Sequence, residues 1–126
     1  MNKKTAALSS IILASFIMLL GMAAVSSATD YVWDNEAGDG NWNTATNWNP
    51  NTVPGTATAQ YARIRTTAGP VFSGQTASVY RIYLEYSNGT LTMNSGTLNV
   101  GQHIYAGQVL TDTATINMNG GEINIV

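Results

Sequence analysis

The stretch that decides the fold is TLTMNSGTLNV, at Thr90–Val100, which recurs further along the chain as TINMNGGEINI, at Thr115–Ile125. Each copy holds two short runs of alternating apolar residues, separated by Asn, a small residue and Gly. That pattern predicts two short strands joined by a turn. The corresponding positions are Leu91 and Ile116, Met93 and Met118, Asn94 and Asn119, Gly96 and Gly121, Leu98 and Ile123, Asn99 and Asn124, and Val100 and Ile125.

A fixed period of about 25 residues predicts a β-solenoid, in which each coil covers the apolar stripe of the coil before it. At about 4.8 Å per step, the corresponding apolar residues would stack in one narrow core. We expect Asn94 and Asn119 to hydrogen-bond along the stack at the corner. Gly96 and Gly121 would relieve the backbone there. The alternative is an accidental likeness between two hairpins of a β-sandwich.

Earlier coils are fainter, but no apolar series with helical spacing follows Thr29, so we predict an all-β protein. Ile64 and Val71 precede Leu91 and Leu98 by slightly more than one such period and would belong to the first coil. Two further expectations concern single segments. They are a strand at Arg81–Tyr86 with Ile82, Leu84 and Tyr86 on one face, and a third strand at His103–Ala106 between the two copies.

Residues 1–28 have the pattern of a secretory signal peptide. Lys3 and Lys4 precede an apolar run at Ile11–Ala24, and small residues follow at Ser26 and Ala28. This order predicts export and cleavage after Ala28. The alternative is an uncleaved membrane anchor, because the run approaches the ~20 residues that a span requires.

The composition argues against several classes of partner. The chain has no cysteine, so disulfide-stapled scaffolds are excluded. Residues 29–126 carry three arginines against seven acidic residues, a formal net charge of −4. Nucleic acid and anionic membrane surfaces need clustered Lys and Arg, so neither is expected to bind. Membrane contact is expected only through the signal segment.

The segment at residues 29–60 is rich in Trp, Asn and Gly, and its large side chains are Trp33, Trp42 and Trp48. Buried indoles would make this segment the N-terminal cap of the solenoid, whose coils would occupy residues 61–126. The alternative is a carbohydrate-binding platform formed by the same three rings. No capping element is visible after the last copy, so we expect the solenoid to be incomplete at its C-terminus.

The residues that could bind metal or perform catalysis form no strong pattern. Asp34, Glu36 and Asp39 are weak candidates for a calcium site, but their spacing breaks the EF-hand rule and GDGN is foremost a turn. We therefore predict no catalytic, cofactor or metal residues. His103, the only histidine, is interpreted as a surface residue. Arg63, Arg65 and Arg81 suggest a polysaccharide lyase β-helix, whose groove carries basic residues and acidic calcium ligands. Arg63 and Arg65 share one face of a strand, but no acidic ligands accompany them, so the arginines are interpreted as a solvated outer face.

The Trp-rich segment and the repeat together resemble a known class of exported proteins. Trp33, Gly40, Trp42, Asn47–Trp48 and Pro54 resemble the opening signature of large secreted bacterial β-repeat proteins. GTLTMNSGTLNV is similar to the autotransporter-associated β-strand repeat, which also occurs in proteins with PEP-CTERM-type sorting tails. One departure is Thr58–Tyr61, where related proteins usually carry an Asp. Any role of that Asp is not carried over to this chain.

This resemblance implies a right-handed parallel β-helix outside the cytoplasm and brings no catalytic residues with it. The expected function is an adhesin-like structural scaffold at the cell surface or outer envelope of a Gram-negative-type bacterium. Its partners would be surface glycans or other envelope proteins. The alternatives are a polysaccharide-binding module and the N-terminal part of a β-helical polysaccharide-degrading enzyme.

Overall fold

The computed structural model describes residues 27–86, 88–107 and 111–126, and this part of the chain is all β apart from one short 3-10 turn, as predicted. The predicted signal peptide lies almost entirely outside the described residues. Within the described part, no helix is long and apolar enough to cross a membrane. The elements are β1 (Thr29–Trp33), η1 (Ala45–Asn47), β2 (Trp48–Asn49), β3 (Gln60–Ile64), β4 (Val71–Phe72), β5 (Gln75–Leu84), β6 (Asn88–Met93), β7 (Gly96–Ala106), β8 (Thr113–Met118) and β9 (Glu122–Ile125).

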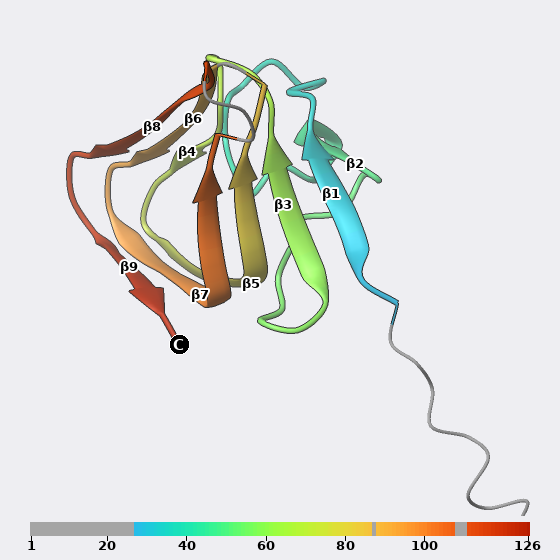
Figure 1. The fold of residues 1–126 in the computed structure, drawn as a ribbon, viewed down its shortest axis with the longest axis vertical. Helices are drawn as coiled ribbons and strands as arrows, with labels where there is room; N and C mark the ends of the chain where they lie inside the picture. Colours follow the sequence, from blue (N-terminus) through green and yellow to red (C-terminus); the bar gives the residue numbers. More distant parts are fainter. Residues whose placement is uncertain (1–26, 87, 108–110) are drawn as a thin grey trace, which may run out of the picture.

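The strands form two sheets, and from β3 onward the chain alternates between them (Figure 1). The six-stranded sheet has the order β2-β1-β3-β5-β7-β9, and the three-stranded sheet has the order β4-β6-β8. All neighbouring strands are parallel except β1 and β2, which are antiparallel. Each pass through both sheets therefore lies beside the pass before it.

The register that the repeat predicts is confirmed in both sheets. Leu91 and Met93 of β6 lie opposite Ile116 and Met118 of β8. In the other sheet, Leu98 and Val100 of β7 lie opposite Ile123 and Ile125 of β9. The same apolar positions of successive passes are thus stacked.

Asparagine side chains connect the passes at the offset of the repeat, as predicted for the corner. The Asn119 amide donates to Asn94 Oδ1 at 2.9 Å, and Asn124 donates to Asn99 Oδ1 at 3.4 Å. At the turn, Gly96 has φ +93°, and a Cβ there would lie 2.2 Å from the Gln75 carbonyl oxygen. Only glycine fits such a position, which explains why the turn ends on Gly.

Ile64 and Val71 lie in β3 and β4, where the alternation between the sheets begins, but they do not correspond in register to Leu91 and Leu98. Ile64 lies opposite Leu84 and Val71 lies opposite Thr92, so both pairs are closer in sequence than the repeat period. A register shift between Val79 and Arg81 of β5 increases the sequence separation between register partners of β5 and β7 in the second half of β5. The last pass, which contains β8 and β9, has a longer repeat period also because the connection from β7 to β8 is longer than that from β5 to β6.

Two expectations about single segments are also wrong. His103–Ala106 forms no separate strand, because β7 runs on without a break from Gly96 to Ala106. Tyr86 does not share the buried face of Ile82 and Leu84. It has φ +53° and is 60% exposed, because the chain turns after β5 and carries it out of the alternation.

The core runs the length of the stack between the sheets. At its first end, Trp48 packs edge to face on Trp33 and on Trp42, with ring centroids 5.1 Å and 4.8 Å away, and Trp42 packs in the same way on Phe72. The buried apolar residues from β3 onward are Ala62, Ile64, Phe72, Val79, Ile82, Leu84, Leu91, Met93, Leu98 and Val100. Because aromatic side chains bury large areas, the aromatic cluster at the first end is a main source of the stability of the core.

Candidate functional site

The three tryptophans predicted as a cap or a sugar platform are core residues. Trp33 is 2% exposed, and Trp42 and Trp48 are fully buried. Two of their ring nitrogens are satisfied inside the protein, since Trp48 donates to the Trp42 carbonyl and Trp33 to the Ala68 carbonyl. No indole face is left open for a sugar ring, so the carbohydrate-binding interpretation of these residues has no support in this arrangement.

The acidic candidates for a metal site hold the loop that precedes β2. Asp39 accepts hydrogen bonds from Thr44 Oγ1, the Asn41 backbone and the Asn47 amide, at 2.6, 2.9 and 2.5 Å. These bonds lower the pKa of the Asp39 carboxyl, with the Thr44 bond as the main cause. Asp34 accepts from the Glu36 backbone at 3.2 Å. Among the residues described, no three His, Cys, Asp or Glu side chains are grouped so that they could hold a metal ion.

A polar pocket of about 390 Å³ lies beside this loop, where it meets β4 and the start of β5. Its lining residues are Asp39, Asn41, Asn43, Val71, Ser73 and Gln75. The carboxylate and amide groups on its loop side are already used in turns, since Asn41 Oδ1 accepts from the Asn43 backbone and Asp39 holds Thr44 and Asn47. The pocket thus continues the polar network of the loop.

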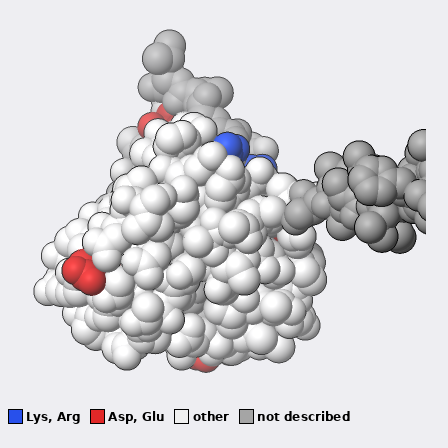
Figure 2. Space-filling view, turned by 90° about the horizontal axis from the view of Figure 1, so that it is seen from below, with Lys and Arg blue, Asp and Glu red and all other residues white. Residues whose placement is uncertain are grey.

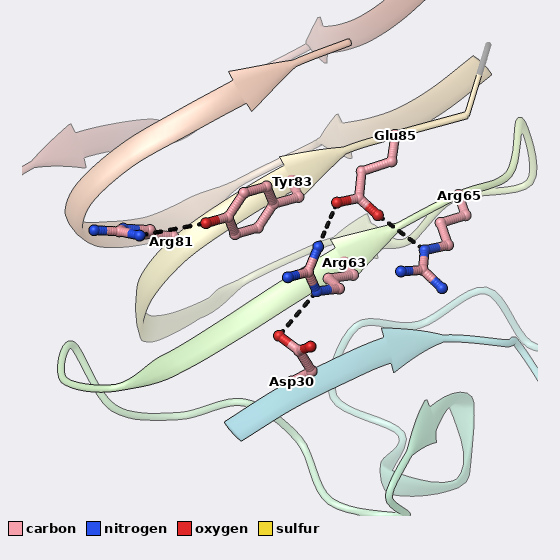
Figure 3. A network of polar contacts seen from close by, with 6 residues as sticks. All are labelled: Asp30, Arg63, Arg65, Arg81, Tyr83 and Glu85. Carbon is pink, nitrogen blue, oxygen red and sulfur yellow. Dashed lines mark hydrogen bonds and ion pairs between the residues drawn. The ribbon is translucent and has the colours of Figure 1, made fainter. Parts of the chain in front are cut away.

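An ion-pair network lies on the outer face of the six-stranded sheet and is the arrangement that sequence reasoning missed (Figure 3). Glu85, which is 1% exposed, follows β5 and pairs with Arg63 through one carboxylate oxygen and with Arg65 through the other, at 2.9 Å. Arg63 Nε also contacts Asp30 of β1 at 2.8 Å. The interpretation of Arg63 and Arg65 as a solvated face without acidic partners is therefore wrong.

Cross-strand pairing assembles this network. Asp30 lies opposite Tyr61 in the β1–β3 pair, on the same side as the Val32–Arg63 pair, and Glu85 follows Leu84, the partner of Ile64. Partial burial tends to lower the pKa of Arg63, but the hydrogen bond to Asp30 and the charge of Glu85 outweigh it, and the pKa is raised. The only signal in the sequence was the pair of arginines in i, i+2 positions, which would need an acidic partner if their face were covered, but it does not identify Asp30 or Glu85 as that partner.

Aromatic rings continue the same face across β3, β5 and β7. Tyr83 and Tyr105 are register partners, and their rings are stacked with centroids 4.8 Å apart and planes 8° from parallel. On the other side of Tyr83 lies the Arg63 guanidinium, 4.4 Å from the ring centroid. In the next row Tyr61, Arg81 and His103 are register partners, with His103 exposed as predicted.

Arg81 is held firmly but not by a carboxylate. Its Nε donates to Gln102 Oε1 at 2.6 Å, one Nη2 hydrogen goes to the same oxygen, and Nη1 donates to the Tyr83 hydroxyl at 3.4 Å. The guanidinium also lies over the rings of Tyr61 and Tyr80, 5.4 Å and 5.1 Å from their centroids. The bond to Tyr83 is the main cause that raises the pKa of Arg81, so its charge is fixed at every physiological pH.

Comparison with protein-family models, with curated proteins and with solved structures found no match. Two features characterise the chain, its fold and its outer surface. These define an all-β protein with two largely parallel sheets, a core closed by indoles at one end, and an outer face on which arginine and tyrosine side chains are aligned in rows. Figure 2 shows that another face carries few charged groups, mainly near its rim.

Proposed function

We propose that this chain is a right-handed parallel β-helix that acts as an exported, adhesin-like structural scaffold at the bacterial cell surface or envelope. The observation that carries the proposal is the stacking of equivalent residues of the two sequence repeats in both sheets at once. A sandwich of unrelated hairpins would give antiparallel pairs rather than parallel ones. The right-handed sense follows from the strong preference of parallel crossover connections for that hand.

The stacking also explains why such a chain suits a structural role. Each pass contacts only its neighbours, so the element can be lengthened without redesigning a central core. Stability comes from ladder hydrogen bonds, stacked apolar side chains and asparagine bonds such as Asn119 to Asn94. Because the chain contains no cysteine, these contacts hold the fold without a disulfide.

The last pass presents an apolar face suited to further stacking. Leu91 and Met93 are fully buried, whereas their partners Ile116 and Met118 are 38% and 49% exposed. Ile125, the partner of buried Val100, is 57% exposed. A further coil of the same pattern would bury these side chains as β8 and β9 bury those of β6 and β7, which is the way a solenoid scaffold grows.

Engineered cysteines test the fold, because the chain has none of its own. Thr92 and Asn117 are register partners whose side chains meet, with the Asn117 amide donating to Thr92 Oγ1 at 3.3 Å. A Thr92→Cys/Asn117→Cys pair should form a disulfide on mild oxidation. The matched control, Thr92→Cys/Thr115→Cys, moves one cysteine two positions along its strand, beyond the ~7 Å reach of a disulfide. Equal cross-linking of both pairs would rule out the stacked register.

Export is tested separately by expressing the full chain, with an epitope after Val126, in a Gram-negative bacterium. We expect the tagged protein outside the cytoplasm, with the mass of a chain that begins at Thr29. Ala28→Trp, which enlarges the residue before the predicted cleavage point, should retain the leader. A full-length tagged chain that stays in the cytoplasm would contradict the export part of the proposal.

A further inference from the structure

Arg81 is a cation of the outer face whose hydrogen-bonding capacity is only partly used and whose partners are all neutral. A guanidinium has five N–H donors. In Arg81, Nε and one Nη2 hydrogen go to Gln102, and one Nη1 hydrogen goes to Tyr83. One hydrogen on each terminal nitrogen therefore remains for an acceptor outside the protein. Two such donors in one plane are suited to bind the two oxygens of a carboxylate.

The charges around this group make the free donors significant. Arg63 and Arg65 are neutralised by Asp30 and Glu85, whereas Arg81 has no carboxylate within ion-pair distance among the described residues. Figure 3 shows Arg81 on the far side of Tyr83 from the Glu85 cluster. The chain has more than twice as many acidic residues as arginines, so an arginine without a carboxylate partner is unexpected. A guanidinium that is held in place by neutral groups alone keeps its charge available to attract an anion.

An open aromatic ring lies beside this cation. One face of the Tyr105 ring is stacked on Tyr83, and the residue as a whole is 40% exposed. β7 lies between β5 and β9, and its pairing with β9 ends at Val100, so on the side away from β5 no described strand covers the second half of β7, where Tyr105 lies. His103, the register partner of Arg81, is exposed and contacts the Tyr105 ring at a right angle, 5.7 Å between centroids.

We propose that Arg81, Gln102, His103 and Tyr105 form a binding site for an acidic saccharide, with a uronate carboxylate on the free Arg81 donors and its sugar ring against Tyr105. The site needs no cleft, because an extended polysaccharide can lie along the outer face of the sheet. A polyphosphate or nucleic acid fits less well, since these ligands require several unneutralised cations and this face offers one among the described residues. The proposal does not depend on export or on the scaffold role.

The test is a titration of the purified, 15N-labelled protein with trigalacturonate, followed by NMR. Maltotriose, a neutral chain with the same number of rings, is the matched ligand. We expect shifts at the Arg81 side chain and at Tyr105 with trigalacturonate alone. Arg81→Gln should weaken binding at least about tenfold, the value expected for losing a charge-assisted pair of hydrogen bonds.

Two further variants keep the result interpretable. Tyr105→Ala removes the ring but keeps the charge, and it should also weaken binding. Tyr86→Ala removes a 60% exposed tyrosine that lies over Arg65 instead, and it should bind like the parent. The circular dichroism of each variant is compared with that of the parent, so that a folding defect is not mistaken for lost binding.

The proposal is overturned by several outcomes. These are no shift with trigalacturonate, equal binding of maltotriose, parent-like binding by folded Arg81→Gln, or tighter binding of tripolyphosphate at the same nitrogen atoms. Raising the salt to about 0.5 M, where exposed charges are screened over a few ångströms, should weaken trigalacturonate binding. Salt-insensitive binding would equally count against a carboxylate–guanidinium contact.

Discussion

The first and the last pass of the stack differ in how far their core residues are covered. At the first end, Trp42 and Trp48 fill the space between the sheets and are fully buried, and the antiparallel strand β2 ends the six-stranded sheet. At the last pass, Ile116 and Ile125 occupy core positions but remain 38% and 57% exposed. The difference shows that burial in this fold depends on a layer on each side, and not on the apolar pattern of a strand alone.

The largest expected effect comes from opening the closed end. Trp42→Ala would leave a cavity between Trp48 and Phe72, and should lower the free energy of unfolding by about 3–5 kcal/mol. That is a large fraction of the ~5–15 kcal/mol typical of a domain, so urea denaturation should show a strongly reduced midpoint.

Trp42→Phe is the matched control for this substitution. The Trp42 Nε1 atom has no hydrogen-bond partner among the described residues, so phenylalanine removes ring area but no bond. We expect a clearly smaller loss than for alanine. Equal losses for the two variants would mean that the indole does not fill the core as described.

Truncating equivalent side chains in two passes tests the need for a covering layer directly. Leu91→Ala should cost about 2–5 kcal/mol, because Leu91 is fully buried under the following pass. Ile116→Ala changes its register partner in the last pass and should cost about 1 kcal/mol or less, since part of that side chain is already in water. Similar losses would show that the last pass is covered in solution.

The repeat could be predicted in detail because its stacked positions carry like residues. Leucine lies opposite isoleucine, methionine opposite methionine and asparagine opposite asparagine, so self-similarity in the sequence reports the register directly. The earlier passes carry no such signal. There Tyr61 lies opposite Arg81, and Arg81 lies opposite His103, so the stacked residues are unlike. The register shift after Val79 also changes the sequence offset between partners within a single strand.

The contacts of the candidate site could not be predicted from the sequence for a related reason. Arg63 and Glu85 lie on different passes, and their contact depends on a β3–β5 register that no repeated residue reveals. Gln102 lies on the next pass and accepts two of the Arg81 hydrogen bonds, and so it helps to determine which Arg81 donors remain free. The tryptophans were recognisable as anchors, but whether their faces were open depended on the packing of β2 and β4 around them.

A smaller effect is expected along the asparagine ladder, defined by Ser73, Asn94 and Asn119. Asn119→Ala removes one exposed hydrogen bond at the end of the ladder and should cost about 0.5–1 kcal/mol. Asn94→Ala removes two, because its amide also donates to Ser73 Oγ at 3.4 Å. Urea denaturation should therefore rank Asn94→Ala below Asn119→Ala in stability, and the reverse order would contradict a continuous ladder.

The smallest effect separates the two regions by their response to acid. The folded-state pKa of Asp39 is lowered by its bonds to Thr44, Asn41 and Asn47, so its contribution is present above the ordinary value of 3.8 and is lost as the pH falls through the lower, folded value. Asp39→Asn should reduce stability at neutral pH and flatten this acid-dependent loss, measured as the thermal midpoint down to about pH 2.5. Asp34→Asn, whose carboxylate accepts the Glu36 backbone bond, is the control and should keep more of the slope. Residues 88–126, which contain both copies of the repeat, have two acidic residues, Asp112 and Glu122. If the slope is unchanged in Asp39→Asn, the acid sensitivity arises in a part of the molecule other than the loop before β2.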